Sequence, residues 1–169
     1  MNRIIVLFVI FFCSSCRLEY QSGLAKLRSE DFKGATEDLS IAYQKDPFNP
    51  EILFARALSR GFYGHYTGAI NDLTRAIKLD PNHANYYFYR GYFKSKFGKE
   101  KGAIEDFSMT IQLYPYYPEA YYNRGIKLLN TGHLSEACQD FQTAIDLGDT
   151  LSIKFKNVYC RKEIIPNEE

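Results

Sequence analysis

Residues 50–83 read PEILFARALSRGFYGHYTGAINDLTRAIKLDPNH, and residues 84–117 read ANYYFYRGYFKSKFGKEKGAIEDFSMTIQLYPYY. The two stretches align without a gap, and further copies begin at Cys16 and Pro118, so the chain repeats at a constant interval of 34 residues. A fixed period of this length is typical of repeat proteins, in which each repeat is a small unit of secondary structure that packs on its neighbours. The repeat therefore decides the fold class.

Small residues recur at two positions of each repeat. The eighth position holds Gly23, Ala57, Gly91 and Gly125, and the twentieth holds Ala35, Ala69, Ala103 and Ala137. Small side chains in both columns indicate that two helices approach each other closely there. A large apolar residue follows the alanine after four residues, which is the spacing of one apolar helical stripe. A proline at the thirty-second position then ends the second helix of the first three repeats.

This pattern resembles the tetratricopeptide repeat, in which 34 residues form two antiparallel helices. The resemblance covers residues 16–149 and implies an all-α fold, a right-handed α-solenoid of four helix pairs. The repeats are residues 16–49, which diverge most, 50–83, 84–117 and 118–149. The apolar residues that follow predict a capping helix over residues 150–162, which leaves residues 163–169 as a tail.

The first residues predict export. Arg3 precedes an apolar run over residues 4–12, which is too short to span a bilayer but long enough for the core of a signal peptide. Ser14 and Ser15 before Cys16 resemble the cleavage box of bacterial lipoproteins, although Cys13 stands where that box usually carries leucine. The resemblance implies removal of residues 1–15 and lipidation of Cys16. An ordinary cleaved signal or an uncleaved anchor is the alternative.

A lipid on Cys16 would place the mature chain at a membrane of the bacterial cell envelope. We expect the outer membrane, with the chain either facing the periplasm or exposed on the surface. Cys138 and Cys160 would then lie in a compartment that permits disulfides, so the two cysteines could pair. The alternative is that both are small buried hydrophobic side chains.

Arginine recurs at the seventh position and aspartate at the twenty-third. We hypothesise that these residues form ion pairs across neighbouring repeats, because the first repeat has Ser22 in the place of the arginine and no repeat before it. Such a ladder would fix the register in which repeats stack. The predicted pairs are Asp38 with Arg56, Asp72 with Arg90, and Asp106 with Arg124.

The resemblance also implies a binding wall. In tetratricopeptide proteins the concave surface is lined mainly by positions 2, 5, 9, 12 and 13 of the first helix. Positions 5 and 9 share one helical face and would form an apolar strip for a peptide; the alternative is that these rings pack against neighbouring helices. The candidate groove residues are Tyr20, Leu24, Phe54, Leu58, Phe88, Tyr92, Tyr122 and Ile126.

A tyrosine-rich tract joins the third and fourth repeats. It reads Tyr-Pro-Tyr-Tyr-Pro over residues 114–118, in a chain with 14 tyrosines and no tryptophan. Clustered tyrosines can anchor a partner because they provide a large contact area at low entropy cost. The tract is therefore either an anchor or a rigid turn between repeats.

Composition and motifs exclude several classes of function. The 21 lysines and arginines nearly balance 20 acidic residues, so no basic surface for nucleic acid is expected. The sequence contains no HExxH motif and no glycine-rich phosphate loop, and the three histidines follow the repeat register. We predict no catalytic residue, no metal ion, no cofactor and no small-molecule substrate.

The predicted function is a membrane-anchored scaffold that binds a protein or peptide in its concave groove. The alternatives are a self-associating structural solenoid and an accessory subunit of an envelope assembly complex. No residue of the sequence selects between them.

Overall fold

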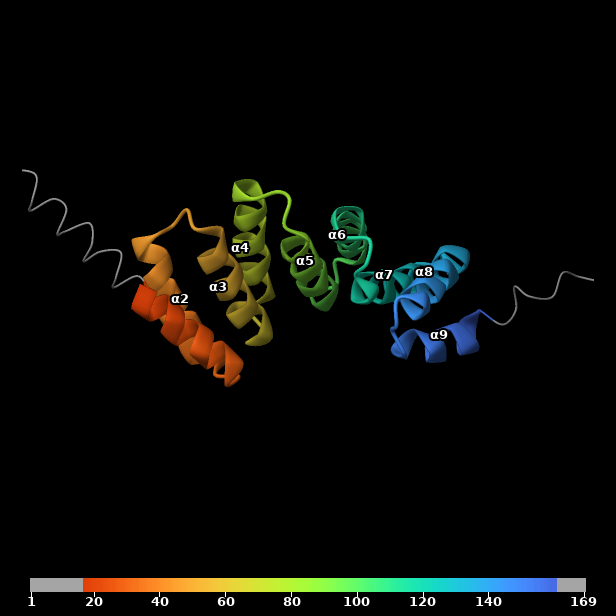
Figure 1. The fold of residues 1–169 in the computed structure, drawn as a ribbon, viewed down its shortest axis with the longest axis horizontal. Coiled ribbons are helices and arrows are strands. Elements are labelled where there is room, and N and C mark those ends of the chain that lie inside the picture. The colour runs from red at the N-terminus through yellow and green to blue at the C-terminus, as the bar shows by residue number, and fades with distance from the viewer. Residues whose placement is uncertain (1–16, 161–169) are drawn as a thin grey trace, which may run out of the picture. The chain divides into compact units, whose positions relative to one another are not determined.

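The computed structural model of the chain describes residues 17–160. The predicted signal peptide, the lipid anchor at Cys16 and the tail lie outside the described residues. All regular secondary structure within residues 17–160 is helical (Figure 1), so the predicted all-α fold class is confirmed. None of the helices in this range is long and apolar enough to cross a membrane.

Each repeat contains two helices. Residues 17–28 form the first helix of the first repeat, and they pair with α2. The remaining helices are α2 (Phe32–Lys45), α3 (Pro50–Phe62), α4 (Tyr66–Leu79), α5 (Ala84–Lys96), α6 (Glu100–Leu113), α7 (Pro118–Asn130), α8 (Leu134–Asp146) and α9 (Leu151–Tyr159). The last of these, α9, lies in the segment predicted to form a capping helix.

The turns between the two helices of a repeat need a left-handed backbone. Gly64, Gly98 and Gly132 have φ angles of +94°, +78° and +85°, a region that glycine adopts without steric penalty. In the first repeat Glu30 takes this conformation instead, with a φ of 61°. The recurring glycine is thus a requirement of the turn geometry.

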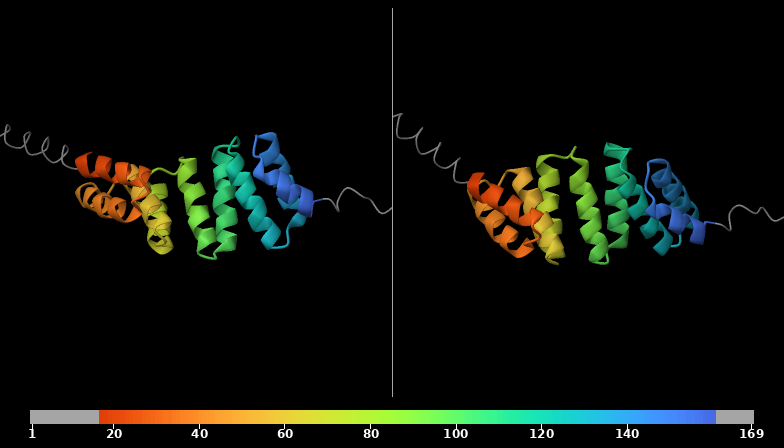
Figure 2. Two further views of the ribbon diagram at one scale, coloured as in Figure 1. Left: turned by 90° about the horizontal axis from the view of Figure 1, so that it is seen from below. Right: turned by 60° about the horizontal axis from the view of Figure 1, so that its bottom comes forward.

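The chain divides into two compact units between Pro81 and Asn82. The described part of the first unit contains the helix of residues 17–28 with α2, α3 and α4, and that of the second contains α5 to α9. Within each unit the helices of a repeat pack in pairs, α3 with α4, α5 with α6, and α7 with α8 (Figure 2). Successive repeats then meet through α2 with α3 and through α6 with α7.

The small residues of the repeat lie where the paired helices are closest. Alanines at the twentieth position, Ala35, Ala69, Ala103 and Ala137, are all fully buried. A Cβ atom added to Gly125 would lie 2.8 Å from a ring carbon of Phe141, and one added to Gly91 would lie 3.1 Å from a ring carbon of Phe107. The close approach predicted from the sequence is therefore present, with a ring from the second helix filling the space that glycine leaves.

Candidate functional site

The recurring arginines of the second, third and fourth repeats form ion pairs with the aspartate of their own repeat. Arg56 donates to Asp72 from Nε at 2.9 Å and from Nη2 at 2.7 Å. The prediction of pairing across repeats is wrong, because positions 7 and 23 lie opposite each other when two helices fold back about a short turn. The pairs present are Arg56 with Asp72, Arg90 with Asp106, and Arg124 with Asp140. Asp38 also pairs within its own repeat, with Lys26 at 2.8 Å.

A second cation joins two of these pairs. Arg60 Nη1 lies 2.7 Å from Asp72 Oδ2, and Lys94 Nζ lies 2.8 Å from Asp106 Oδ2. The sequence signal is a basic eleventh position, one helical turn after the arginine, which sequence reasoning overlooked. Both aspartates are buried, so two cations compensate for the loss of hydration around each carboxylate.

The arginines do reach the preceding repeat, but through other groups. The guanidinium of Arg56 lies 3.7 Å above the ring of Tyr43 on α2, and Arg75 also donates a hydrogen bond to the Tyr43 hydroxyl. In the second unit, Arg124 Nη1 donates to Ser108 Oγ on α6 at 3.0 Å. Arg56 and Arg124 therefore contact the preceding repeat through a ring and a hydroxyl rather than through a carboxylate.

The candidate groove residues at the fifth position mostly pack inside the protein. Tyr20 contacts the buried cluster of Ala35, Leu39 and Ala55, and Leu24 packs there as well. Phe88 is only 8% exposed and its ring lies 4.7 Å from that of Tyr117. Tyr122 makes an edge contact with Phe155 of α9 at 5.6 Å. These contacts favour the packing alternative for Tyr20, Phe88 and Tyr122.

The other groove candidates lie at the edge of the packed interior. Phe54, Leu58, Tyr92 and Ile126 are half-buried, so part of each side chain reaches the surface of the first helix. The second and thirteenth positions of the same helices are exposed and carry mixed charge: Glu51, Asn85 and Glu119 at the second, and Arg28, Phe62, Lys96 and Asn130 at the thirteenth. Each of α3, α5 and α7 thus presents half-buried apolar side chains flanked by exposed, mostly polar positions.

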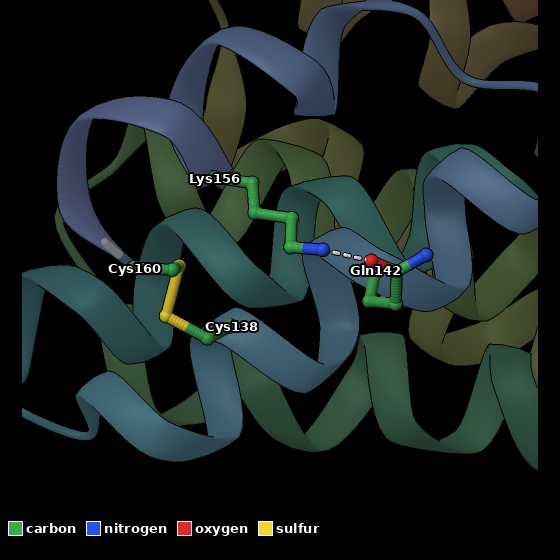
Figure 3. Close-up of a disulfide and its surroundings, with 4 residues drawn as sticks. All are labelled: Cys138, Gln142, Lys156 and Cys160. Carbon is green, nitrogen blue, oxygen red and sulfur yellow. Dashed lines mark hydrogen bonds between the residues drawn. A yellow bond between two sulfur atoms is a disulfide. The ribbon is translucent and has the colours of Figure 1, made fainter. Parts of the chain in front are cut away.

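Cys138 on α8 and Cys160 after α9 form a disulfide (Figure 3). Their Cα atoms lie 5.8 Å apart, and both cysteines are buried. On the same side, Lys156 of α9 donates a hydrogen bond to Gln142 of α8, and the Phe155 ring packs on Phe141. Of the two alternatives for these cysteines, the structure contains the disulfide, which joins the last helix to the fourth repeat.

A pocket of about 440 Å³ opens in the second unit where the third and fourth repeats meet. Residues 82–85 line it together with Leu113, Tyr114 and Tyr117. The rings of Tyr114 and Tyr117 lie 6.2 Å apart at an angle of 69°. Burial raises the pKa of Tyr117 to about 12. Sequence reasoning singled out the tyrosine tract but missed residues 82–85, which lie a whole repeat earlier in the chain.

The fold and the 34-residue repeat are similar to those of tetratricopeptide-repeat proteins. A family model described as a TPR repeat matches residues 64–96. The chain accordingly has an all-α TPR solenoid fold, built of helix pairs. No curated protein sequence matches the chain.

Several solved structures share this fold. MamA residues 41 to the end from Desulfovibrio magneticus RS-1 is similar with a TM-score of 0.79, at 23% identity over 88% of this chain and 86% of that one. YrrB, described as a TPR protein with an unusual peptide-binding site, has a TM-score of 0.78, at 20% identity over 86% and 76%. The first TPR domain of Spaghetti (RPAP3), bound to the HSP90 peptide SRMEEVD, has a TM-score of 0.67, at 19% identity over 70% and 94%.

Proposed function

We propose that this protein is an interaction scaffold that binds a peptide or protein partner along its first helices. The observation that carries the proposal is the surface of these helices: α3 carries half-buried Leu58 with exposed Glu51 and Phe62, and α5 carries half-buried Tyr92 with exposed Lys96. Apolar contacts at the centre of an interface with a polar rim around them are the usual anatomy of protein recognition. Two similar structures, YrrB and the Spaghetti domain, are described as binding peptides, which supports the same role.

The buried charges support a scaffold rather than an enzyme. Asp72 and Asp106 each hold two cations of their own repeat, so these carboxylates are engaged in holding helices together. Residues 17–160 hold no group of three or more histidines, cysteines or acidic residues that could bind a metal ion. The buried carboxylates thus have a structural role, and we assign partner binding to the exposed side chains of the first helices.

Photo-crosslinking at defined positions tests this proposal. A photoreactive amino acid is placed in living cells at Glu51 or Lys96, which are exposed positions of first helices. The matched controls are Asn71 and Glu105, which are equally exposed but lie at the twenty-second position on second helices. The proposal expects the same adduct from both first-helix positions and none from the controls. Adducts of equal yield from all four positions, or from the controls only, would contradict it.

We further propose that a lipid on Cys16 anchors the scaffold to a membrane of the bacterial envelope, at the outer membrane. The support is the Ser14-Ser15-Cys16 sequence after a short apolar run. Fatty-acid labelling of the chain and of a Cys16→Ser variant is the test. If Cys16 is the anchor, the wild type incorporates the labelled fatty acid and is found in the membrane fraction, and the variant does neither. Unchanged labelling of the variant would show that Cys16 is not the lipidated residue.

The apolar surface of α9 favours a second candidate function, self-association. Leu151 and Val158 are 61% and 63% exposed on a helix of nine residues. Solenoids normally end in a polar outer face. Size-exclusion chromatography with light scattering measures the mass of the chain and of a Val158→Asp variant. A dimeric wild type and a monomeric variant would support self-association. A wild type that is monomeric at all concentrations would support the scaffold alone.

A further inference from the structure

The junction between the third and fourth repeats departs from the pattern of the others. At the thirty-first position, Asp46 and Asp80 stand in the first two junctions, but Tyr114 stands in the third. At the thirty-fourth position, Asn49 caps α3 by accepting from the backbone N–H groups of two residues. His83 at the start of α5 and Tyr117 at the start of α7 make no such side-chain bond. The third junction thus differs from the first two by carrying tyrosine at both positions, Tyr114 and Tyr117.

Packing explains only part of this aromatic surface. Tyr117 stacks on Phe88 and belongs to the interior of the second unit. Tyr114 is 52% exposed, and its ring forms one wall of the 440 Å³ pocket at an angle to the ring of Tyr117. An exposed ring held against a fixed one forms a corner of two aromatic faces that is open to solvent.

The remaining walls of the pocket are uncharged. None of the residues that line it is lysine, arginine, aspartate or glutamate, so an ionic ligand finds no permanent counter-charge there. The ring of His83, which also lines the pocket, stacks on Tyr86 at 4.1 Å. Asn85 contributes a side-chain amide, whose NH₂ group can donate hydrogen bonds. Leu113 and Ala84 contribute apolar surface. The ligand that fits has apolar rings and hydrogen-bond acceptors but no net charge.

Among extended and folded peptides, polyproline II segments match this chemistry best. A helical ligand requires a long groove for anchors at several turns, and an added strand requires a sheet edge, which residues 17–160 do not contain. Proline supplies a flat apolar ring and a carbonyl acceptor and has no N–H group that needs a partner. Its segments are already extended before binding, so little conformational entropy is lost on a small, open site.

We propose that the pocket formed by residues 82–85, Leu113, Tyr114 and Tyr117 binds a proline-rich segment of a partner protein. Proline rings lie in the corner between Tyr114 and Tyr117, and the Asn85 amide donates to a peptide carbonyl. The inference deepens the proposed scaffold function by naming a class of ligand. Asn85 also lies at an exposed second position of the first helices, but Tyr114 does not belong to those helices, so loss of Tyr114 separates the two proposals.

A labelled octaproline peptide tests the inference on the purified full chain. Fluorescence anisotropy measures its affinity for the wild type and for two variants of exposed lining residues, Tyr114→Ala and Asn85→Ala. The matched control is Tyr116→Ala, since Tyr116 is 72% exposed in the same loop but does not line the pocket. Circular dichroism confirms that each variant is folded.

The inference expects saturable binding that weakens by about tenfold or more in Tyr114→Ala and Asn85→Ala and is unchanged in Tyr116→Ala. No saturable binding of octaproline, or equal binding by Tyr114→Ala, would overturn it. Binding of an N-acetylglucosamine oligomer in place of octaproline, lost in Tyr114→Ala, would identify a carbohydrate site and overturn it as well. In each of these cases the crosslinks from Glu51 and Lys96 still report on the scaffold function.

Discussion

Arg56 and Asp72 form a bidentate ion pair between the two helices of one repeat, and the ring of Tyr43 from the preceding repeat lies against the same guanidinium. The arginine therefore closes its own helix pair and contacts the neighbouring one at the same time. Both charged side chains are almost completely buried, at 6% and 4% exposure. This arrangement makes the pair sensitive to the loss of either partner.

Removal of the Asp72 carboxylate should destabilise the protein strongly. In Asp72→Ala the buried Arg56 loses its counter-ion, a change that typically costs about 3–5 kcal/mol. Asp38→Ala is the matched control, because Asp38 pairs with the more exposed Lys26 and should contribute about 1 kcal/mol or less. Urea unfolding followed by circular dichroism measures both. An equal loss of unfolding free energy in the two variants would contradict the prediction that burial makes the Arg56–Asp72 pair the more costly one to break.

Gly125→Ala should destabilise the fourth repeat by about 1–3 kcal/mol, because the new Cβ atom would lie 2.8 Å from the Phe141 ring. The second repeat suggests the compensation, since it carries Ala57 and Leu73 at the two equivalent positions. The double variant Gly125→Ala with Phe141→Leu should therefore recover stability relative to the sum of the single changes. Strict additivity in thermal unfolding would count against a direct clash.

Reduction of the Cys138–Cys160 disulfide should destabilise the fold by about 3 kcal/mol, given the sequence separation of 22 between the two cysteines. The protein is unfolded in urea with and without a phosphine reductant. The double variant Cys138→Ser with Cys160→Ser serves as the control and should unfold at the same point in both conditions. A reductant effect of equal size on this variant would rule out the disulfide as its cause.

The Tyr117 hydroxyl should ionise at a higher pH than an ordinary tyrosine. Burial raises its pKa from 10.0 to about 12, so the folded state binds this proton more tightly than the unfolded chain. The Tyr117 side chain therefore contributes stability below pH 10 that is lost as the pH rises through 12. Absorbance titration of the phenolates should show one tyrosine fewer near pH 12 in Tyr117→Phe than in the wild type. If the Tyr117→Phe variant instead shows one tyrosine fewer in the main transition near pH 10, Tyr117 ionises as an exposed tyrosine and the prediction is wrong.

The candidate site was predictable only in part. The Arg56, Arg90 and Arg124 column was recognised from the sequence, but its partners were assigned to the wrong repeat, because a period shows that residues are equivalent and not which of them face each other. The fifth-position rings were recognised too, yet Phe88 and Tyr122 pack against Tyr117 and Phe155. Helical periodicity gives the direction of a side chain, whereas its burial depends on what the neighbouring helices place there.

The sequence alone determined the all-α repeat fold. The 34-residue interval, the small residues at the eighth and twentieth positions, and the turn glycines are local requirements of two closely packed helices, so they can be read without coordinates. The tertiary structure decided the contacts between residues distant in the chain. It shows that Cys138 bonds to Cys160, that Arg56 pairs with Asp72 of its own repeat, and that residues 82–85 line a pocket with Tyr114. Such contacts depend on how helices pack, which a repeating pattern constrains but does not specify.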